Sequence, residues 1–198
     1  MILLLAAVVA GLVSGLIRAK FGHRPYQPYQ LQLTWLVVVA LIPQWLVFSF
    51  PPTRTIIPDA VASTFLVLSQ LLLVVFAWAN RKTAGFWLLG FGLLLNLAVI
   101  ASNGGFMPIS PETVRWLVPE ASPDAWAIGE RFGTGKDIVL RIEETNLYFL
   151  SDQLRTPDLF DYRVAFSVGD VWIALGAFWL LWSSGGPVYR PSKKEIIQ

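Results

Sequence analysis

Apolar residues gather in five long runs along the chain, and polar segments separate the runs. The runs cover residues 2–17, 31–50, 60–79, 84–101 and 165–182. A helix that crosses the hydrocarbon core of a bilayer needs about 17 to 25 mostly apolar residues. The second, third and fourth runs contain no Lys, Arg, Asp, Glu or His. The pattern therefore predicts an all-α membrane protein with five transmembrane helices.

The segment between the fourth and fifth runs is polar and too long for a bare connection. Residues 102–164 are therefore expected to form a structured extracytoplasmic segment. Two helix starts are present, because Ser110-Pro111-Glu112 and Ser122-Pro123-Asp124 each place a capping hydroxyl before a proline and an acid. Residues 137–142 alternate in the manner of a short strand, and residues 146–154 are apolar enough to return to the membrane surface.

Basic residues mark which ends of the predicted helices face the cytoplasm, because positively charged loops resist translocation. Their positions alternate between the loops and predict an N-terminus outside and a C-terminus inside. The chain then divides into a four-helix transmembrane region (1–101), the extracytoplasmic segment with short interfacial helices (102–164), the fifth transmembrane helix (165–184) and a basic cytoplasmic tail (185–198). The orienting residues are Arg18, Lys20, Arg24, Arg81, Lys82, Arg190, Lys193 and Lys194.

Composition narrows the classes of function. Of the 198 residues 55% are hydrophobic and only 14% are charged, against about 25% charged residues in soluble domains. The net charge of +2 without a dense basic stripe argues against a nucleic-acid partner. The absence of cysteine and the single His23 leave no basis for expecting a metal or a cofactor. The expected partners are the lipid bilayer and other membrane subunits.

A few small and polar residues lie within the apolar runs. Ala7, Gly11 and Gly15 repeat every four residues and predict a face for close helix contact, although glycine and alanine are also common in membrane helices. Gln70 and Asn96 are candidates for hydrogen bonds between helices. A transport or ligand role is the alternative for these two residues. Nine tryptophans, several near the ends of runs, predict an interfacial aromatic belt.

Two carboxylates are the candidates for chemistry. Asp170 opens the fifth run, where the positive end of the helix dipole favours a structural capping role. Asp152 precedes it by a short connection. Two carboxylates that share one site can act as general base and general acid, which is the arrangement required for aspartyl proteolysis. Asp158 and Asp161 lie between them in the sequence, so the pairing stays open.

Three motifs resemble an uncharacterised bacterial family of polytopic membrane proteins, domain-of-unknown-function family 5317. They are Asn103-Gly104-Gly105-Phe106-Met107-Pro108, Leu150-Ser151-Asp152 and Phe166-Ser167-Val168-Gly169-Asp170. The resemblance covers nearly the whole chain. It implies a multi-pass protein of the bacterial cytoplasmic (inner) membrane and brings no activity with it.

A second resemblance concerns the C-terminal part. The segment that ends in Asp170 is similar to the Phe-Asn-x-Ala-Asp motif of lipoprotein signal peptidase, and Asn103-Gly104-Gly105 is similar to its Asn-x-Gly-Ala-Ala stretch. This likeness implies Asp152 and Asp170 as catalytic acids with Asn103 nearby. Asp152 lacks the flanking residues of the peptidase motif, and the peptidase has four spans.

Three functions remain for comparison. The main hypothesis is a non-catalytic structural or accessory subunit of a membrane assembly. The alternative is an intramembrane aspartyl peptidase-like hydrolase that uses Asp152 and Asp170. A small carrier, with a polar cavity around Gln44, Gln70 and Asn96, is the third hypothesis.

Overall fold

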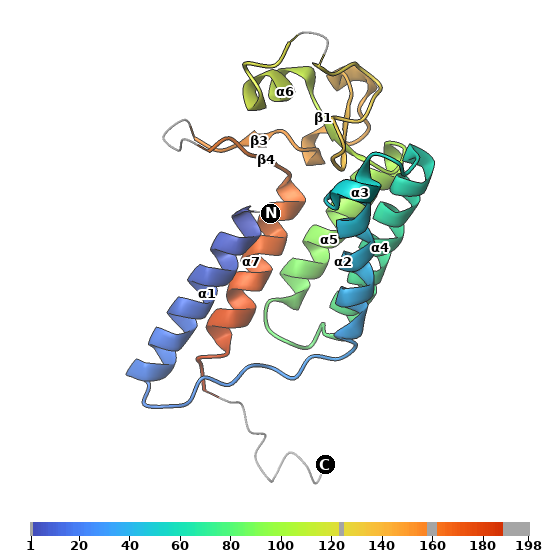
Figure 1. Cartoon of the computed structure of the whole chain (residues 1–198). Coiled ribbons are helices and arrows are strands. Elements are labelled where there is room, and N and C mark those ends of the chain that lie inside the picture. Colours follow the sequence, from blue (N-terminus) through green and yellow to red (C-terminus); the bar gives the residue numbers. More distant parts are fainter. Residues whose placement is uncertain (1, 123–124, 158–161, 188–198) are drawn as a thin grey trace.

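The computed structural model describes residues 2–122, 125–157 and 162–187, and within these ranges five long helices lie side by side (Figure 1). The polar segment between the last two of them covers one end of this bundle. The long helices are α1 (Ile2–Phe21), α2 (Trp35–Phe48), α4 (Asp59–Ala79), α5 (Phe86–Ser102) and α7 (Val168–Ser183). A short helix, α3 (Pro51–Arg54), connects α2 to α4. The mostly helical fold confirms the predicted helical class.

Two of the long helices, α1 and α4, are long and apolar enough to cross a membrane by length and composition. The other three are shorter apolar helices of 14, 17 and 16 residues in α2, α5 and α7. Each of the five predicted runs therefore contains one helix. The five spans and their orientation stay predictions.

The second run is helical over a shorter length than predicted, because its first residues belong to a connection. Residues 22–34 follow the end of the bundle from α1 to α2 (Figure 1). Asn80, at the end of α4, holds this connection: its Oδ1 accepts from the Gln32 backbone N–H at 2.8 Å, and its Nδ2 donates to the Gln32 carbonyl at 2.9 Å. Leu33 has a φ of 54° just before α2 begins.

The helices contact one another in the order α1, α7, α5, α4, α2. Small residues allow the closest approaches. The buried residues of α1 are Gly11, Gly15 and Ala19. A Cβ atom on Gly11 would lie 2.8 Å from the Phe178 carbonyl oxygen of α7. The predicted close-contact face of α1 is therefore confirmed at Gly11 and Gly15, with Ala19 extending it.

Glycines also bring α5 and α7 together at two levels. Gly92 lies against the Gly169 backbone near one end of the contact. Gly176 lies against Gly85 and Leu89 near the other end. Because neither glycine has a side chain at these levels, the two helix backbones nearly touch.

Polar residues connect α2 to α4 inside the bundle. The Gln44 Nε2 donates to the Ser69 hydroxyl at 2.5 Å. Gln44 follows Pro43, which lies within α2. The neighbouring Gln70 has a buried Oε1 that lacks a hydrogen-bond partner among the residues that the structure describes. The bond between these helices is therefore made by Gln44 and Ser69.

The polar segment folds into two small sheets and one helix. Strand β1 (Met107–Ile109) pairs in parallel with β2 (Asp137–Val139), and β3 (Leu154–Arg155) pairs antiparallel with β4 (Ala165–Phe166). Helix α6 (Pro111–Leu117) begins after Ser110, whose hydroxyl accepts from the Thr113 N–H at 3.1 Å. Two 3₁₀ turns, η2 (Ile142–Glu144) and η3 (Tyr148–Leu150), precede β3.

Two predictions for this segment are confirmed, namely the helix start at Ser110 and an extended segment beginning at Asp137. Ile109, Val114 and Val139 form the core of the segment. The second helix start falls largely outside the described residues, because these omit Pro123 and Asp124. Most of the predicted basic tail, residues 188–198, lies outside them as well.

Candidate functional site

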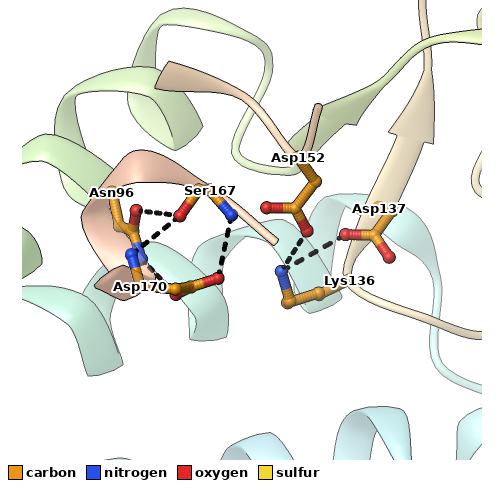
Figure 2. A network of polar contacts seen from close by, with 6 residues as sticks. All are labelled: Asn96, Lys136, Asp137, Asp152, Ser167 and Asp170. Atoms are coloured by element: carbon orange, nitrogen blue, oxygen red, sulfur yellow. Dashed lines mark hydrogen bonds and ion pairs between the residues drawn. The ribbon is translucent and has the colours of Figure 1, made fainter. Parts of the chain in front are cut away.

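A cluster of charged and polar side chains lies where the polar segment meets the ends of α5 and α7 (Figure 2). We call it the junction cluster. The polar segment supplies its cation and two of its acids, while α5 and the start of α7 supply the rest. Its members are Asn96, Lys136, Asp137, Asp152, Ser167 and Asp170.

Lys136 is the centre of the junction cluster. It lies directly before β2, and its carbonyl accepts from the Met107 N–H of β1 at 3.0 Å. The ammonium donates to Asp152 Oδ2 at 2.9 Å and lies 3.3 Å from Asp137 Oδ1. Parallel pairing of β1 with β2 thus fixes the position of the cation.

Asp152 lies just after η3 and is almost completely buried. Its side chain is 5% exposed, whereas that of Lys136 is 43% exposed. The Asp152 backbone N–H donates to the Pro108 carbonyl at 3.1 Å. Its second carboxylate oxygen, Oδ1, is buried and lacks a hydrogen-bond partner in the described part of the chain. One oxygen of this acid is therefore bonded and the other is bare.

Asp170 caps the helix that it opens. Its backbone N–H donates to the Ser167 hydroxyl at 3.0 Å, and its Oδ2 accepts from the Ser167 N–H at 3.2 Å. This reciprocal pair is a capping box. Asn96 of α5 donates to Asp170 Oδ1 at 2.9 Å and accepts from the Ser167 hydroxyl at 2.8 Å. The capping role predicted for Asp170 and the interhelical role predicted for Asn96 are both present.

Burial dominates the electrostatics of Asp152. It raises the pKa of this carboxyl from its usual value to about 7; Lys136 acts in the opposite direction, and Asp137 and Asp170 add to the rise. Burial would lower the pKa of the Lys136 ammonium. The surrounding carboxylates and the hydrogen bond to Asp152 outweigh that effect, so this pKa lies above its usual value. Lys136 therefore stays charged at neutral pH, while Asp152 can gain a proton there.

We expect the difference in unfolding free energy between the native chain and an Asp152→Asn variant to depend on pH. The Asp152 carboxyl has a pKa of about 7 when folded and about 3.9 when unfolded. Its proton therefore stabilises the folded state fully below about pH 4, and this contribution is lost as the pH rises through 7. The amide of the variant carries no titrating proton, so other acids cancel in the difference.

Thermal unfolding of both proteins in detergent, at pH values from 4 to 8, measures this difference. The native chain should lose stability relative to the variant up to about pH 7 and then level off. An equal stability difference at every pH would contradict the buried acid described above.

Asn103 lies at the end of α5 and is committed to local structure. Its Nδ2 donates to the Val99 carbonyl at 2.7 Å and to the Asn146 carbonyl at 2.9 Å, and its Oδ1 accepts from the Asn146 N–H at 2.9 Å. These bonds hold the loop before η3 to the bundle. The structure brings Asp152 and Asp170 into one cluster, where Asp152 is bonded to Lys136 and Asp170 to Asn96 and Ser167 (Figure 2). The proposed catalytic roles of Asp152, Asp170 and Asn103 stay predictions.

Lys136 was missed in the sequence analysis. It follows the glycines of the loop 129–135, where a lysine is ordinarily a solvated residue. The available signal was a Lys-Asp pair placed directly before the apolar residues of β2. Within the described ranges, no group of three or more His, Cys, Asp or Glu side chains comes together in a way that could hold a metal ion.

A second cation fixes the same loop to α4. Arg131 pairs with Asp59, the first residue of α4, at 2.7 Å. Its guanidinium also lies 5.7 Å from the ring centre of Phe48 and 5.6 Å from that of Phe106. Arg131 therefore holds this loop against α4, while Lys136 ties the end of the loop to Asp152 within the polar segment.

One family model matches the chain, over residues 28–182, and its description is a family of unknown function (DUF5317). The match spans all the helices after α1 and the whole polar segment. No curated protein and no solved structure matches the chain.

Proposed function

The chain belongs to the DUF5317 family of unknown function, and we propose that it is a non-catalytic structural or accessory subunit of a membrane assembly. It would be a multi-pass protein of the bacterial cytoplasmic membrane, with α1, α2, α4, α5 and α7 as its spans. The connections rich in Lys and Arg would then face the cytoplasm, and the polar segment would lie outside.

One observation carries the non-catalytic part of this proposal. The Lys136 ammonium donates to Asp152 Oδ2 at 2.9 Å and pairs with Asp137 as well (Figure 2). An aspartyl hydrolase needs a water within hydrogen-bond reach of both carboxylates. Here the Lys136 ammonium bonds one oxygen of Asp152, while the two oxygens of Asp170 accept from Asn96 and from the Ser167 N–H. Each acid therefore has a structural role: Asp152 pairs with Lys136 within the polar segment, and Asp170 caps α7 and bonds it to α5.

The arrangement of the helices favours an accessory role. Because the helices contact one another in a single order with α1 at one edge, α1 packs mainly on α7. Of its 20 residues, the buried ones are Gly11, Gly15 and Ala19. The remaining apolar surface of α1, which includes Val9 and Val13, is exposed. Such a face suits a second membrane helix as well as it suits lipid.

Native mass spectrometry of the tagged full chain, extracted from its own membrane in a mild detergent, tests the accessory role. We expect one other membrane protein at a fixed ratio. Val13→Trp on α1 should lower that ratio by about fivefold, because a larger side chain spoils a packed helix contact. Val39→Trp on the exposed face of α2 is the matched control and should leave the ratio unchanged. A chain recovered only as a monodisperse monomer would refute the proposal.

The second candidate function is an intramembrane aspartyl peptidase-like hydrolase, and the pKa of Asp152 near 7 favours it. An acid with this pKa can both donate and accept a proton at neutral pH. The test incubates the purified chain with labelled single-span membrane peptides. Cleavage that is lost in both Asp152→Asn and Asp170→Asn, and retained in Asp59→Asn, would support the hydrolase over the accessory subunit.

A further inference from the structure

A pocket lies between α4 and α5, at the end of the bundle away from the polar segment. It encloses about 130 Å³. Eight of its nine lining residues are apolar or aromatic, and the ninth is Arg81. We call it the α4–α5 pocket. A mostly apolar cavity with one cation matches a ligand that has an apolar body and an anionic end.

Arg81 is held at this pocket by Trp78. Its guanidinium lies 4.5 Å from the centre of the Trp78 ring, and its Nη1 donates to the Trp78 carbonyl at 3.0 Å. This is the one hydrogen bond of the Arg81 side chain among the described residues. A guanidinium has five N–H donors and binds a phosphate through two of them at once. Arg81 is therefore pre-positioned and still able to bind an anion.

Two exposed tryptophans flank the same pocket. Trp78 is 60% exposed and Trp87 is 66% exposed, and their rings meet edge to face with centres 6.3 Å apart. Tryptophan at such positions is typical of the level where lipid headgroups meet hydrocarbon. In a bilayer, the cation and the two rings would therefore lie at headgroup depth, together with the mouth of the pocket.

The start of α5 adds to the positive potential. Gly85 precedes this 17-residue helix and provides no side-chain cap. The positive end of the helix dipole and the exposed Lys82 both lie beside Arg81 in the turn between α4 and α5. Charge complementarity thus favours an anionic ligand at this end of the pocket.

We propose that the α4–α5 pocket binds one anionic glycerophospholipid from the surrounding bilayer. One acyl chain would lie along the apolar walls, beside Phe91 and Leu94. The headgroup phosphate would bind the guanidinium of Arg81. This site is independent of the junction cluster, which lies at the opposite end of the bundle.

Native mass spectrometry of the full chain tests the proposal, with the chain delipidated and then titrated with phosphatidylglycerol or with phosphatidylcholine. We expect phosphatidylglycerol to be retained about fivefold more than phosphatidylcholine, the effect of one well-placed basic residue. Arg81→Gln should remove this preference. Arg18→Gln is the matched control, because Arg18 also stacks on a tryptophan, Trp182, at 4.0 Å. It should keep the preference.

A pocket variant separates a bound lipid from general attraction to a basic surface. Leu94→Trp fills the pocket without changing charge, and it should lower the retention of both lipids. Identical elution of each variant and the native chain in size-exclusion chromatography verifies folding. Equal retention of the two lipids by the native chain, equal losses in the two arginine variants, or full retention by Leu94→Trp would each overturn the proposal.

Discussion

Gly176→Ala is expected to destabilise the folded chain by about 3 kcal/mol, near the upper end of the range for overpacking. A Cβ atom at this position of α7 would lie 2.5 Å from the Leu89 backbone nitrogen and 2.7 Å from the Gly85 carbonyl oxygen of α5. Both are backbone atoms and cannot swing aside. The two helices would have to separate, and the gain of about 1 kcal/mol from replacing glycine by alanine within a helix would not compensate.

Gly90→Ala in α5 is the matched control, with the opposite expected sign. The nearest atom to its Cβ would be the side-chain Cβ of Ala77 at 3.3 Å. A small shift accommodates that contact, so the helix-propensity gain should leave this variant as stable as the native chain or slightly more stable. Thermal unfolding of both variants in one detergent makes the comparison. A Gly176→Ala protein as stable as Gly90→Ala would disprove the close backbone contact.

The glycine contacts show how far a sequence pattern reaches. The four-residue spacing of Gly11 and Gly15 predicted a contact face on α1, and the structure confirms it against α7. The contact of α5 with α7 was not predicted. Its glycines are seven residues apart in both segments, with Gly85 just before α5 and Gly92 within it, and with Gly169 and Gly176 within α7. The seven-residue spacing is visible in the sequence. It indicates a helix contact only when the two segments, which are far apart in the chain, are known to pack together.

Local signals predicted the ends of helices where the chain itself supplies the partner. The start of α6 at Ser110 follows from a hydroxyl, a proline and an acid within three residues. The start of α2 within the second run depends instead on contacts with a distant part of the chain. The first residues of that run leave the helix for a connection that Asn80 holds through two bonds to Gln32. Hydropathy alone assigns those residues to the helix, because it contains no information about hydrogen bonds to distant residues such as Asn80.

In the junction cluster, too, some positions follow from local sequence and others depend on distant contacts. The capping role of Asp170 was predicted from its place at the start of an apolar run, and Ser167 supplies the matching hydroxyl three residues earlier. The position of Lys136 depends instead on the parallel pairing of β1 with β2, whose strands are separated by α6 and a long loop. A sequence pattern does not specify such a pairing, so Lys136 and Asp137 were not predicted as site residues, whereas Asp152 and Asp170 were.

Lys136→Met is expected to destabilise the chain by about 2 kcal/mol at pH 8, less than the 3–5 kcal/mol for breaking a fully buried pair, because the Lys136 side chain is 43% exposed. The loss leaves the buried Asp152 without its cation and beside two further acids, Asp137 and Asp170. Limited proteolysis of the polar segment should also become faster, since the pair that joins the start of β2 to the residues after η3 is lost. Lys20→Met, at an exposed lysine of α1, serves as the control for a change in net charge.

The pH dependence and a second substitution identify the cause of that loss. At pH 5 the Asp152 carboxyl is largely protonated even beside Lys136, because its pKa is about 7. At this pH, Lys136→Met therefore leaves less negative charge unpaired on Asp152. The destabilisation caused by the substitution should be smaller at pH 5 than at pH 8. In the double variant Lys136→Met with Asp152→Asn, the buried charge is gone at every pH, so most of the stability lost at pH 8 should return. If the double variant were no more stable than Lys136→Met alone, the unpaired charge of Asp152 would not be the cause of the loss.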